Sequence, residues 1–324
     1  MRALLAMAML ATACSEYDGG PLYRLEPPDD GWPTIVELEP DELYRFRLDV
    51  PPGTRGFSIY TEGPSDEISA VSELYAPDGR GVIEGGAFQL GDGDRGSGHT
   101  DVATLSMPNH DIDVSAGGIW RVGVAPGTEH VEVWSAAAVD ASARVVDIVT
   151  HAEQPYHGDT ELRVLFEDAL GRLGLTPGRI ERRKTVERVR IDLSEADDDT
   201  ALIPREDQPV LNVIFYWELD GAAGSSPAPG LPRGGSRVGG LVLEHDAGPR
   251  LLAHEIGHFL GLFHTTDERG NDLLESTPPC EPEVFADSPA LCPGQDNLMD
   301  PQPTDDVLTA EQRRVIESSV LWHP

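Results

Sequence analysis

The chain has 324 residues, of which 39% are hydrophobic and 25% charged, a balance typical of soluble globular proteins with room for two domains. It carries 57 acidic and 24 basic residues, for a formal net charge of -33. Because nucleic-acid binding needs a basic face, this charge argues against nucleic acid as a partner. The charge is otherwise typical of a solvated acidic surface.

The first 13 residues combine one basic residue, a short apolar run and small residues, the pattern of a secretory signal. The run is too short to span a bilayer. LATA before Cys14 resembles a bacterial lipobox, so we expect Cys14 to be a lipidated first residue that anchors a cell-envelope lipoprotein to a membrane. The alternative is an ordinary secretion signal followed by an unrelated cysteine. Residues 14–30 are polar with Gly and Pro and are typical of a tether.

Residues 31–140 consist of short runs separated by turns that contain Gly and Pro. The run at 44–50 alternates apolar and polar residues with the period of two that indicates a half-buried strand. Similar short runs follow at 57–61, 72–76, 119–124 and 131–134. No stretch of helical period interrupts them, so we expect an all-β sandwich domain. Its GDGDRGSGHTD segment either binds Ca²⁺ through oxygen ligands or is a solvated turn.

A different pattern begins at residues 143–151, which form a buried-type strand and open a second domain, residues 143–324. An amphipathic helix follows, with Asp159 or Thr160 as its N-cap and a core stripe made of Leu162, Leu165, Phe166, Ala169, Leu170 and Leu173. Strand-like runs at 186–193 and 211–219 come next. This order predicts an α+β domain with a mixed sheet in front of the next helix. The loop at 221–240 has a composition poor for a strand.

The segment LLAHEIGHFLGLFH, residues 251–264, has the spacing of a metal site. In a helix, His254 and His258 lie one turn apart on the same face, where two imidazoles can share one ion. Glu255 flanks that face and can take a proton from a metal-bound water, as a general base does. Gly261 allows the helix to end and the chain to turn, so that His264 supplies a third ligand. The fourth tetrahedral position is left for water.

This pattern, H-E-x-x-H-x-x-G-x-x-H followed by N-L-M, resembles the metzincin zinc endopeptidases. HEIGHFLGLFHTT, DLLESTPPC and the closing LTAEQRRVI make residues 143–324 most similar to the pappalysin-like branch. The resemblance implies one catalytic Zn²⁺ held by His254, His258 and His264, with Glu255 as the base and a protein or peptide as substrate. It also implies that Met299 forms an apolar floor under the zinc.

Two further implications of the resemblance concern the substrate cleft. In metzincins the region that matches 221–240 contains an edge strand that pairs with an extended substrate. Several branches also place a tyrosine two residues after the methionine, where this chain has Pro301. We therefore expect oxyanion stabilisation from the zinc and from backbone donors.

Two cysteines remain when Cys14 is set aside. Cys280 and Cys292 flank a Pro-rich loop between the third histidine and Met299, so in an oxidising compartment we expect a disulfide between them. The alternative is two unpaired thiols. The segment 265–277 is acidic and either holds a structural Ca²⁺, as in some relatives, or is a solvated loop.

The last expected element is a helix with a capping box made by Thr309 and Gln312 and an apolar face made by Val315, Ile316 and Val320.

The whole pattern predicts an exported zinc-dependent endopeptidase. Two alternatives remain. One is an exported binding lipoprotein with a non-catalytic zinc, although structural zinc usually has four ligands rich in Cys. The other is a functional β-domain, an adhesin or carbohydrate binder, in front of a degraded protease.

Overall fold

The structure is a computed structural model of the whole chain. It describes residues 21–25, 34–38, 45–64, 69–83, 102–108, 113–137, 144–152, 155–184, 206, 208–217, 219, 223–227, 230, 239–265, 274, 276–277, 292–301 and 303–323. The predicted signal, the predicted lipidation site Cys14 and the glycine-rich segment at 91–101 lie outside these residues. Within them, no helix is long and apolar enough to cross a membrane.

The N-terminal half consists of two sheets. Its strands are β1 (Leu22–Arg24), β2 (Thr34–Leu38), β3 (Arg45–Val50), β4 (Thr54–Glu62), β5 (Val71–Tyr75), β6 (Gly81–Ile83), β7 (Val102–Met107), β8 (Gly118–Val124) and β9 (His130–Ala137). One sheet has the order β1-β3-β8-β5-β6 and the other β2-β9-β4-β7. All pairings are antiparallel except that of β1 with β3.

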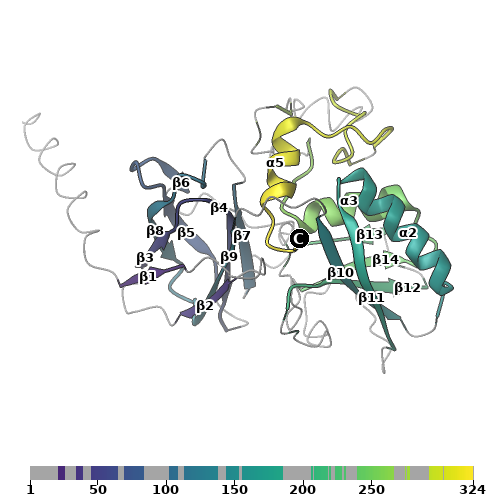
Figure 1. Ribbon diagram of the computed structural model, residues 1–324, viewed down its shortest axis with the longest axis horizontal. Coiled ribbons are helices and arrows are strands. Elements are labelled where there is room, and N and C mark those ends of the chain that lie inside the picture. The colour runs from purple at the N-terminus through teal and green to yellow at the C-terminus, as the bar shows by residue number, and fades with distance from the viewer. Residues whose placement is uncertain are drawn as a thin grey trace, which may run out of the picture.

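One cluster of buried side chains joins these two sheets. Leu48 and Trp120 come from the first sheet, and Ile59 and Val133 from the second. Residues of β3 alternate between half-buried and buried, as a period-two strand with one face on a core must. The two sheets therefore face each other across one core (Figure 1). The predicted strands correspond to β3, β4, β5, β8 and β9. The domain boundaries stay a prediction.

The C-terminal half contains a mixed sheet covered by helices. Its elements are β10 (Val145–Ala152), α2 (Asp159–Arg172), β11 (Thr176–Lys184), β12 (Leu211–Tyr216), β13 (Gly224–Ser225), β14 (Leu241–Glu244), α3 (Pro249–Phe259) and α5 (Ala310–Ser318). The strand order is β11-β10-β12-β14-β13. Neighbouring strands are parallel except for β13, which pairs antiparallel with β14 at the edge.

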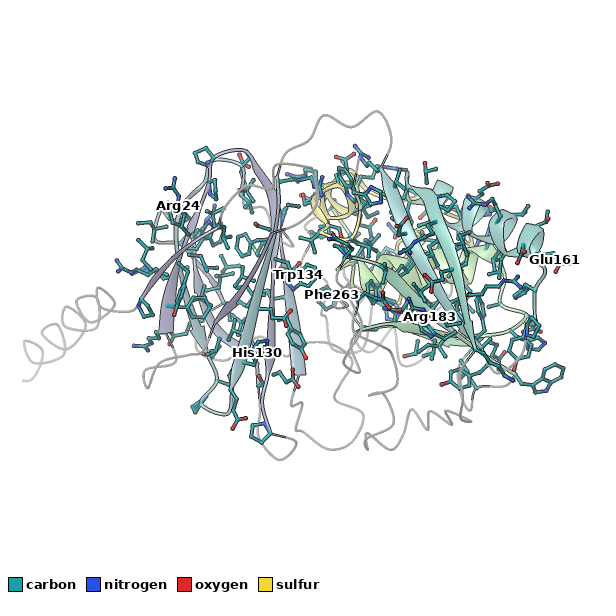
Figure 2. All side chains as sticks on the ribbon, turned by 60° about the horizontal axis from the view of Figure 1, so that its bottom comes forward. Arg24, His130, Trp134, Glu161, Arg183 and Phe263 are labelled. Atoms are coloured by element: carbon teal, nitrogen blue, oxygen red, sulfur yellow. The ribbon has the colours of Figure 1, made fainter. Side chains whose placement is uncertain are left out.

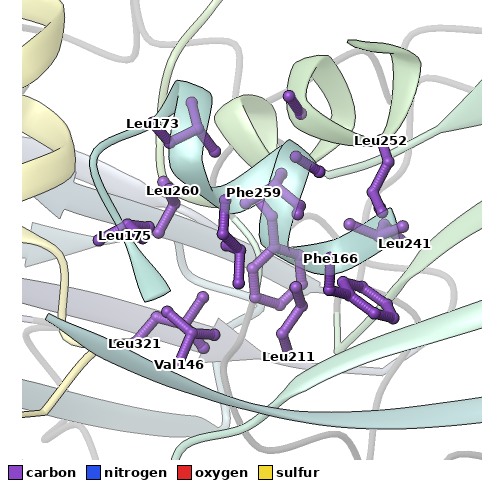
Figure 3. Close-up of a cluster of buried hydrophobic side chains, with 14 of the residues drawn as sticks. Val146, Phe166, Leu173, Leu175, Leu211, Leu241, Leu252, Phe259, Leu260 and Leu321 are labelled. Atoms are coloured by element: carbon purple, nitrogen blue, oxygen red, sulfur yellow. The ribbon is translucent and has the colours of Figure 1, made fainter. Parts of the chain in front are cut away.

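The two helices α2 and α3 cover the same face of this sheet. Side chains of β10, β12 and β14 form one buried cluster with α2 and α3, drawn in Figure 3; its labelled members include Val146, Phe166, Leu211, Leu241, Leu252 and Phe259. A fully buried Leu or Phe contributes about 2–3 kcal/mol of transfer free energy. This core fixes α3 against the sheet and so fixes the direction in which its other face points.

One local expectation for this half is wrong, and one strand is additional to those expected. The N-cap of α2 is Gly158, not Asp159 or Thr160. Its N–H donates to the Glu161 carboxylate at 2.7 Å. The side chain at the third helical position thus supplies the acceptor for the backbone N–H of the N-cap residue. The strand after α2 is β11 at 176–184, which we did not expect, because its run of arginines hides any apolar pattern. The predicted strand at 186–193 lies outside the described residues.

The two halves of the chain meet at the C-terminal segment. Arg55 of β4 donates to the carbonyl of Ser319 at 2.9 Å, and its guanidinium lies 3.4 Å from the centre of the Trp322 ring. A methyl group at Gly56 would lie 2.2 Å from the carbonyl oxygen of Ser318, so β4 and the end of α5 touch closely. A small buried cluster spans the same contact and consists of Tyr60, Trp134, Ala136 and Val320. Figure 2 shows Trp134 and Phe263 in the middle of the molecule, where the halves meet.

Candidate metal centre and active site

Helix α3 presents the first three predicted site residues. It begins with Gly248 as N-cap and Pro249 at the first helical position, where the missing proline N–H costs nothing. Leu252 and Ile256 face the sheet, with no measurable exposure. His254, Glu255 and His258 are also buried, at 5%, 5% and 6% exposure, so the polar side of this helix is enclosed as well. Burial of polar side chains costs free energy, so three of them buried together indicate a functional site.

The end of α3 delivers the third histidine. Gly261 has φ of +102°, a conformation that side chains other than glycine's rarely adopt. Its N–H donates to the His258 carbonyl at 2.8 Å, and the N–H of Leu262 donates to the Gly257 carbonyl at 3.0 Å. These two bonds form a Schellman motif, which closes the helix and reverses the chain. His264 follows three residues later, as the sequence predicts.

The three histidines converge on one point. The Nε2 atoms of His254 and His264 are 3.1 Å apart, those of His258 and His254 3.1 Å, and those of His258 and His264 3.0 Å. Nitrogens that are each about 2.0–2.1 Å from one tetrahedral zinc lie roughly 3.3 Å from one another. The triangle of nitrogens therefore has the size that a single zinc ion requires. No other group of His, Cys, Asp or Glu among the described residues has this spacing.

Backbone carbonyls orient two of these rings. His254 Nδ1 lies 2.7 Å from the carbonyl oxygen of Leu298, and His258 Nδ1 lies 2.8 Å from that of Leu262. A carbonyl can only accept, so each Nδ1 carries the proton and each Nε2 presents its lone pair. Burial, followed by the neighbouring His264, lowers the pKa of His254 from 6.5 to about 4. Burial and both neighbouring imidazoles also lower the pKa of His258. Both rings are neutral at pH 7.

The arrangement of the three histidines suits a metal ion. Two Nε2 lone pairs that point at each other at 3.1 Å repel unless a cation lies between them. Neutral imidazole nitrogens suit Zn²⁺, and a set of three histidines is a common arrangement in catalytic zinc sites. The residues present therefore fit a zinc ion.

Glu255 lies between the metal site and the edge of the sheet. A methyl group at Gly224 of β13 would lie 3.0 Å from Glu255 Oε1 and 2.9 Å from a methyl carbon of Leu243. Gly224 pairs with Leu243 in the sheet, so β13 runs directly beside the carboxylate. A glycine at this position lets the backbone approach Glu255. Within the described part of the chain β13 is the last strand of the sheet, and its backbone thus lies next to the carboxylate.

Met299 lies against the back of α3. Its side chain has no measurable exposure, and a methyl group at Gly257 would lie 2.5 Å from its sulfur. The carbonyl of Met299 accepts from the N–H of Thr265 at 3.1 Å, which joins the turn to the segment that carries His264. The preceding residue, Leu298, supplies the carbonyl that orients His254. The methionine turn therefore packs against α3. It also contacts His254 and Thr265, the residue after His264.

The remaining predicted residues are placed only in part. Cys292 is buried and disulfide-bonded, while Cys280 lies outside the described residues, so their pairing stays a prediction. The candidate calcium ligands between 266 and 273 also lie outside them. Pro301 is half-buried. The carbonyls of Leu262 and Leu298 and the role of Gly224 were not predictable from the sequence, because backbone groups leave no residue-type signal.

No protein-family model matches the chain, and no curated protein matches its sequence. Among solved structures, mature mirolysin of Tannerella forsythia with a cleaved peptide matches at 14% identity and TM-score 0.32, over 54% of this chain and 91% of that one. Archaemetzincin of Methanopyrus kandleri matches at 14% and 0.29, over 56% and 91%.

A third solved structure, metalloproteinase-II of Bacteroides fragilis, matches at 11% identity and TM-score 0.29, over 60% of this chain and 63% of that one. The three proteins bear the names of metallopeptidases. Their TM-scores are all below 0.5, so these matches carry no argument about what this chain does.

Proposed function

We propose that the chain is a zinc-dependent endopeptidase. The observation that carries this proposal is the convergence of three Nε2 atoms within 3.0–3.1 Å of one another, two of them from the helix that also carries the buried Glu255. His254, His258 and His264 would hold the ion through those nitrogens. Three protein ligands leave one tetrahedral position for water or substrate, as catalytic zinc sites do.

The chemistry follows from the positions of the residues. When bound, zinc supplies Lewis acidity, which polarises the scissile carbonyl and lowers the pKa of the attacking water. Glu255 accepts the proton of that water and returns it to the nitrogen of the leaving amine, so no proton is left over when the peptide bond breaks. Within the described residues β13 is the edge strand, which would offer backbone groups to an extended peptide, and Gly224 brings that backbone close to Glu255.

The proposal has several finer parts. The enzyme belongs to the pappalysin-like branch of metzincins and is an exported lipoprotein anchored through Cys14. Cys280 and Cys292 form a disulfide, which suits an oxidising compartment. The two N-terminal sheets constitute a β-sandwich domain. Support for these parts comes from the sequence patterns and, for the last, from the single core that joins the two sheets.

Peptide-library cleavage read by mass spectrometry tests the proposed function. The protein is the chain from Ser15 onward, assayed with zinc, with a chelator, and as Glu255→Gln. The matched control is Glu167→Gln, which makes the same change on an exposed position of α2. We expect cleavage by the wild type and by the control, and we expect its loss with the chelator and in Glu255→Gln.

Two results would overturn parts of the proposal. A wild type that binds one zinc per chain and cleaves no peptide would contradict the endopeptidase and favour the binding lipoprotein. Full cleavage by Glu255→Gln with zinc bound would contradict the general-base role of the carboxylate. Removal of a general base typically costs 10²–10⁴-fold in rate, so the assay needs that range.

A further inference from the structure

Two buried amide side chains connect the closing helix to the methionine turn. Asn297 Nδ2 donates to Gln312 Oε1 at 2.8 Å, and Gln312 Nε2 donates back to Asn297 Oδ1 at 3.1 Å. Asn297 is 4% exposed and Gln312 is 1% exposed. A reciprocal amide pair enclosed in this way is strongly held, because breaking it would leave buried polar groups without partners.

Each oxygen of the pair has a second partner on its own side. Asn297 Oδ1 also accepts from the N–H of Met299 at 2.9 Å, which holds the turn. Gln312 Oε1 also accepts from the N–H of Thr309 at 2.9 Å, which closes the start of α5. The pair is therefore one continuous network from the first turn of α5 to the backbone of the methionine turn.

The methionine turn orients the imidazole ring of His254. Leu298 lies between Asn297 and Met299, and its carbonyl lies 2.7 Å from His254 Nδ1. The N–H of Leu298 is held by the carbonyl of Val307 at 2.8 Å. The peptide that orients His254 is thus fixed by the Asn297 side chain on one side and by the segment leading into α5 on the other.

We propose that Gln312 is a positioning residue for the metal site. It closes the N-terminus of α5 and, through Asn297, holds the 297–300 turn where the Leu298 carbonyl orients His254. The proposal rests on the proposed function in one respect, that the ion is zinc. Groups that orient a metal ligand typically change metal affinity 10–100-fold when they are altered, even though they never touch the ion.

Gln312→Glu separates the two roles of this residue. Glutamate is the usual capping-box residue at this position, so its carboxylate still accepts from Thr309 N–H and from Asn297 Nδ2. It has no N–H to offer Asn297 Oδ1. A rotated Asn297 amide would move its donor to the other carboxylate oxygen, but it would place Asn297 Oδ1 against the first oxygen and would take the acceptor away from Met299 N–H. Neither arrangement restores the whole network.

Thr309→Ala is the matched control, because it weakens the helix start and leaves the amide pair in place. The Thr309 hydroxyl accepts from Gln312 N–H at 3.2 Å, and loss of such a cap lowers the melting temperature by roughly 2–4 °C. We expect this variant to bind zinc as tightly as the wild type. A merely structural role for Gln312 predicts instead that zinc affinity follows stability in both variants.

The measurement is the dissociation constant for zinc, obtained by chelator competition on the full chain, together with the absorption of Co²⁺-loaded protein as a report on ligand geometry. For Gln312→Glu we expect zinc affinity to fall roughly tenfold. An unchanged affinity would overturn the proposal, and so would an equal loss in Thr309→Ala. If Gln312→Glu does not fold, zinc affinity is measured for Asn297→Asp, which keeps the acceptor for Met299 N–H. The same two outcomes, an unchanged affinity or an equal loss in Thr309→Ala, would overturn the proposal.

The outcomes also separate this proposal from the proposed function. A wild type that binds zinc but cleaves no peptide would remove the endopeptidase and leave the positioning role of Gln312 measurable. A wild type that binds no zinc would remove both, since the histidines would then hold no ion to be positioned.

Discussion

Gly257 and Met299 are packed so closely that a single methyl group would not fit between them. A Cβ built at Gly257 would lie 2.5 Å from the Met299 sulfur and 3.2 Å from its methyl carbon. Gly257 lies between Glu255 and His258 on α3, so this contact sets how near the methionine turn comes to the metal site. A glycine at this helix position costs helix propensity, and the close approach of the turn accounts for it.

Gly257→Ala is therefore expected to destabilise the protein. Overpacking of a filled core typically costs about 1–3 kcal/mol, and here Met299 has no exposed side to move toward. Gly171→Ala in α2 is the control, because a methyl group there meets nothing within 4 Å. It should gain up to about 1 kcal/mol from helix propensity. Urea unfolding of the two variants checks the pair, and a Gly257→Ala protein as stable as Gly171→Ala would contradict the packing argument.

Gly224→Ala is expected to impair catalysis without impairing metal binding. Its methyl group would lie 3.0 Å from Glu255 Oε1 and would push the carboxylate from its place. A displacement of about 1 Å can cost roughly 100-fold in rate, so we expect kcat/KM to fall by about 10- to 100-fold. Zinc affinity should stay unchanged, because no histidine is touched. A loss of zinc together with activity would show that the substitution acts on the fold and not on Glu255.

Acid destabilisation is expected from His151, a buried residue outside the metal site. Its Nε2 donates to Asn212 Oδ1 at 3.0 Å, and the Asn212 amide donates to the Gly239 carbonyl at 3.0 Å. Burial lowers the pKa of His151 below 6.5, outweighing the hydrogen bond to Asn212, which raises it. Because the unfolded chain then binds more protons, stability falls as pH drops below 6.5 toward the folded-state pKa.

His151→Gln tests this, since glutamine can donate to Asn212 and does not titrate. The slope from one group is at most about 1.4 kcal/mol per pH unit. We expect the free energy of unfolding of metal-free protein to fall less between pH 7.5 and 5.5 in the variant than in the wild type. Parallel curves would contradict the assignment. Comparison of the two proteins cancels the contributions of His254 and His258.

Arg55 is expected to hold the two halves of the chain together. Its guanidinium stacks on Trp322 and donates to the carbonyl of Ser319 at 2.9 Å. Burial, with a smaller contribution from Arg144, lowers the pKa of Arg55 to about 9, which reflects the cost of enclosing this cation. The stacking and the charged hydrogen bond outweigh that cost only while both partners are present.

Arg55→Ala should lower the free energy of unfolding by about 1–3 kcal/mol. Arg55→Met, which fills the same volume over Trp322, should lower it less. The control is Arg24→Ala, whose side chain is 75% exposed and pairs with Asp49 at 3.8 Å, and which should change stability by less than about 0.5 kcal/mol. Equal effects of Arg55→Ala and Arg24→Ala in chemical denaturation would remove the role of Arg55 at this contact.

The sequence by itself determined the parts of the molecule that depend on local geometry. The spacing of His254 and His258 is set by the helix period, and the position of Gly261 is set by the way a helix ends. The capping box of Thr309 and Gln312 lies in the structure as predicted, for the same reason. Strands with a period-two pattern, such as β3, were also predictable, because the pattern reflects one buried face.

The tertiary structure decided everything that depends on segments far apart in the chain. β13 has two residues and no pattern of its own, and it is a strand because β14 lies beside it. The carbonyl of Leu298 reaches His254 across 44 positions, and Asn297 finds Gln312 across 15. Such contacts leave no periodic mark, since they depend on how packed elements bring chain segments together. The sequence therefore named the three histidines, and the fold decided how they are held.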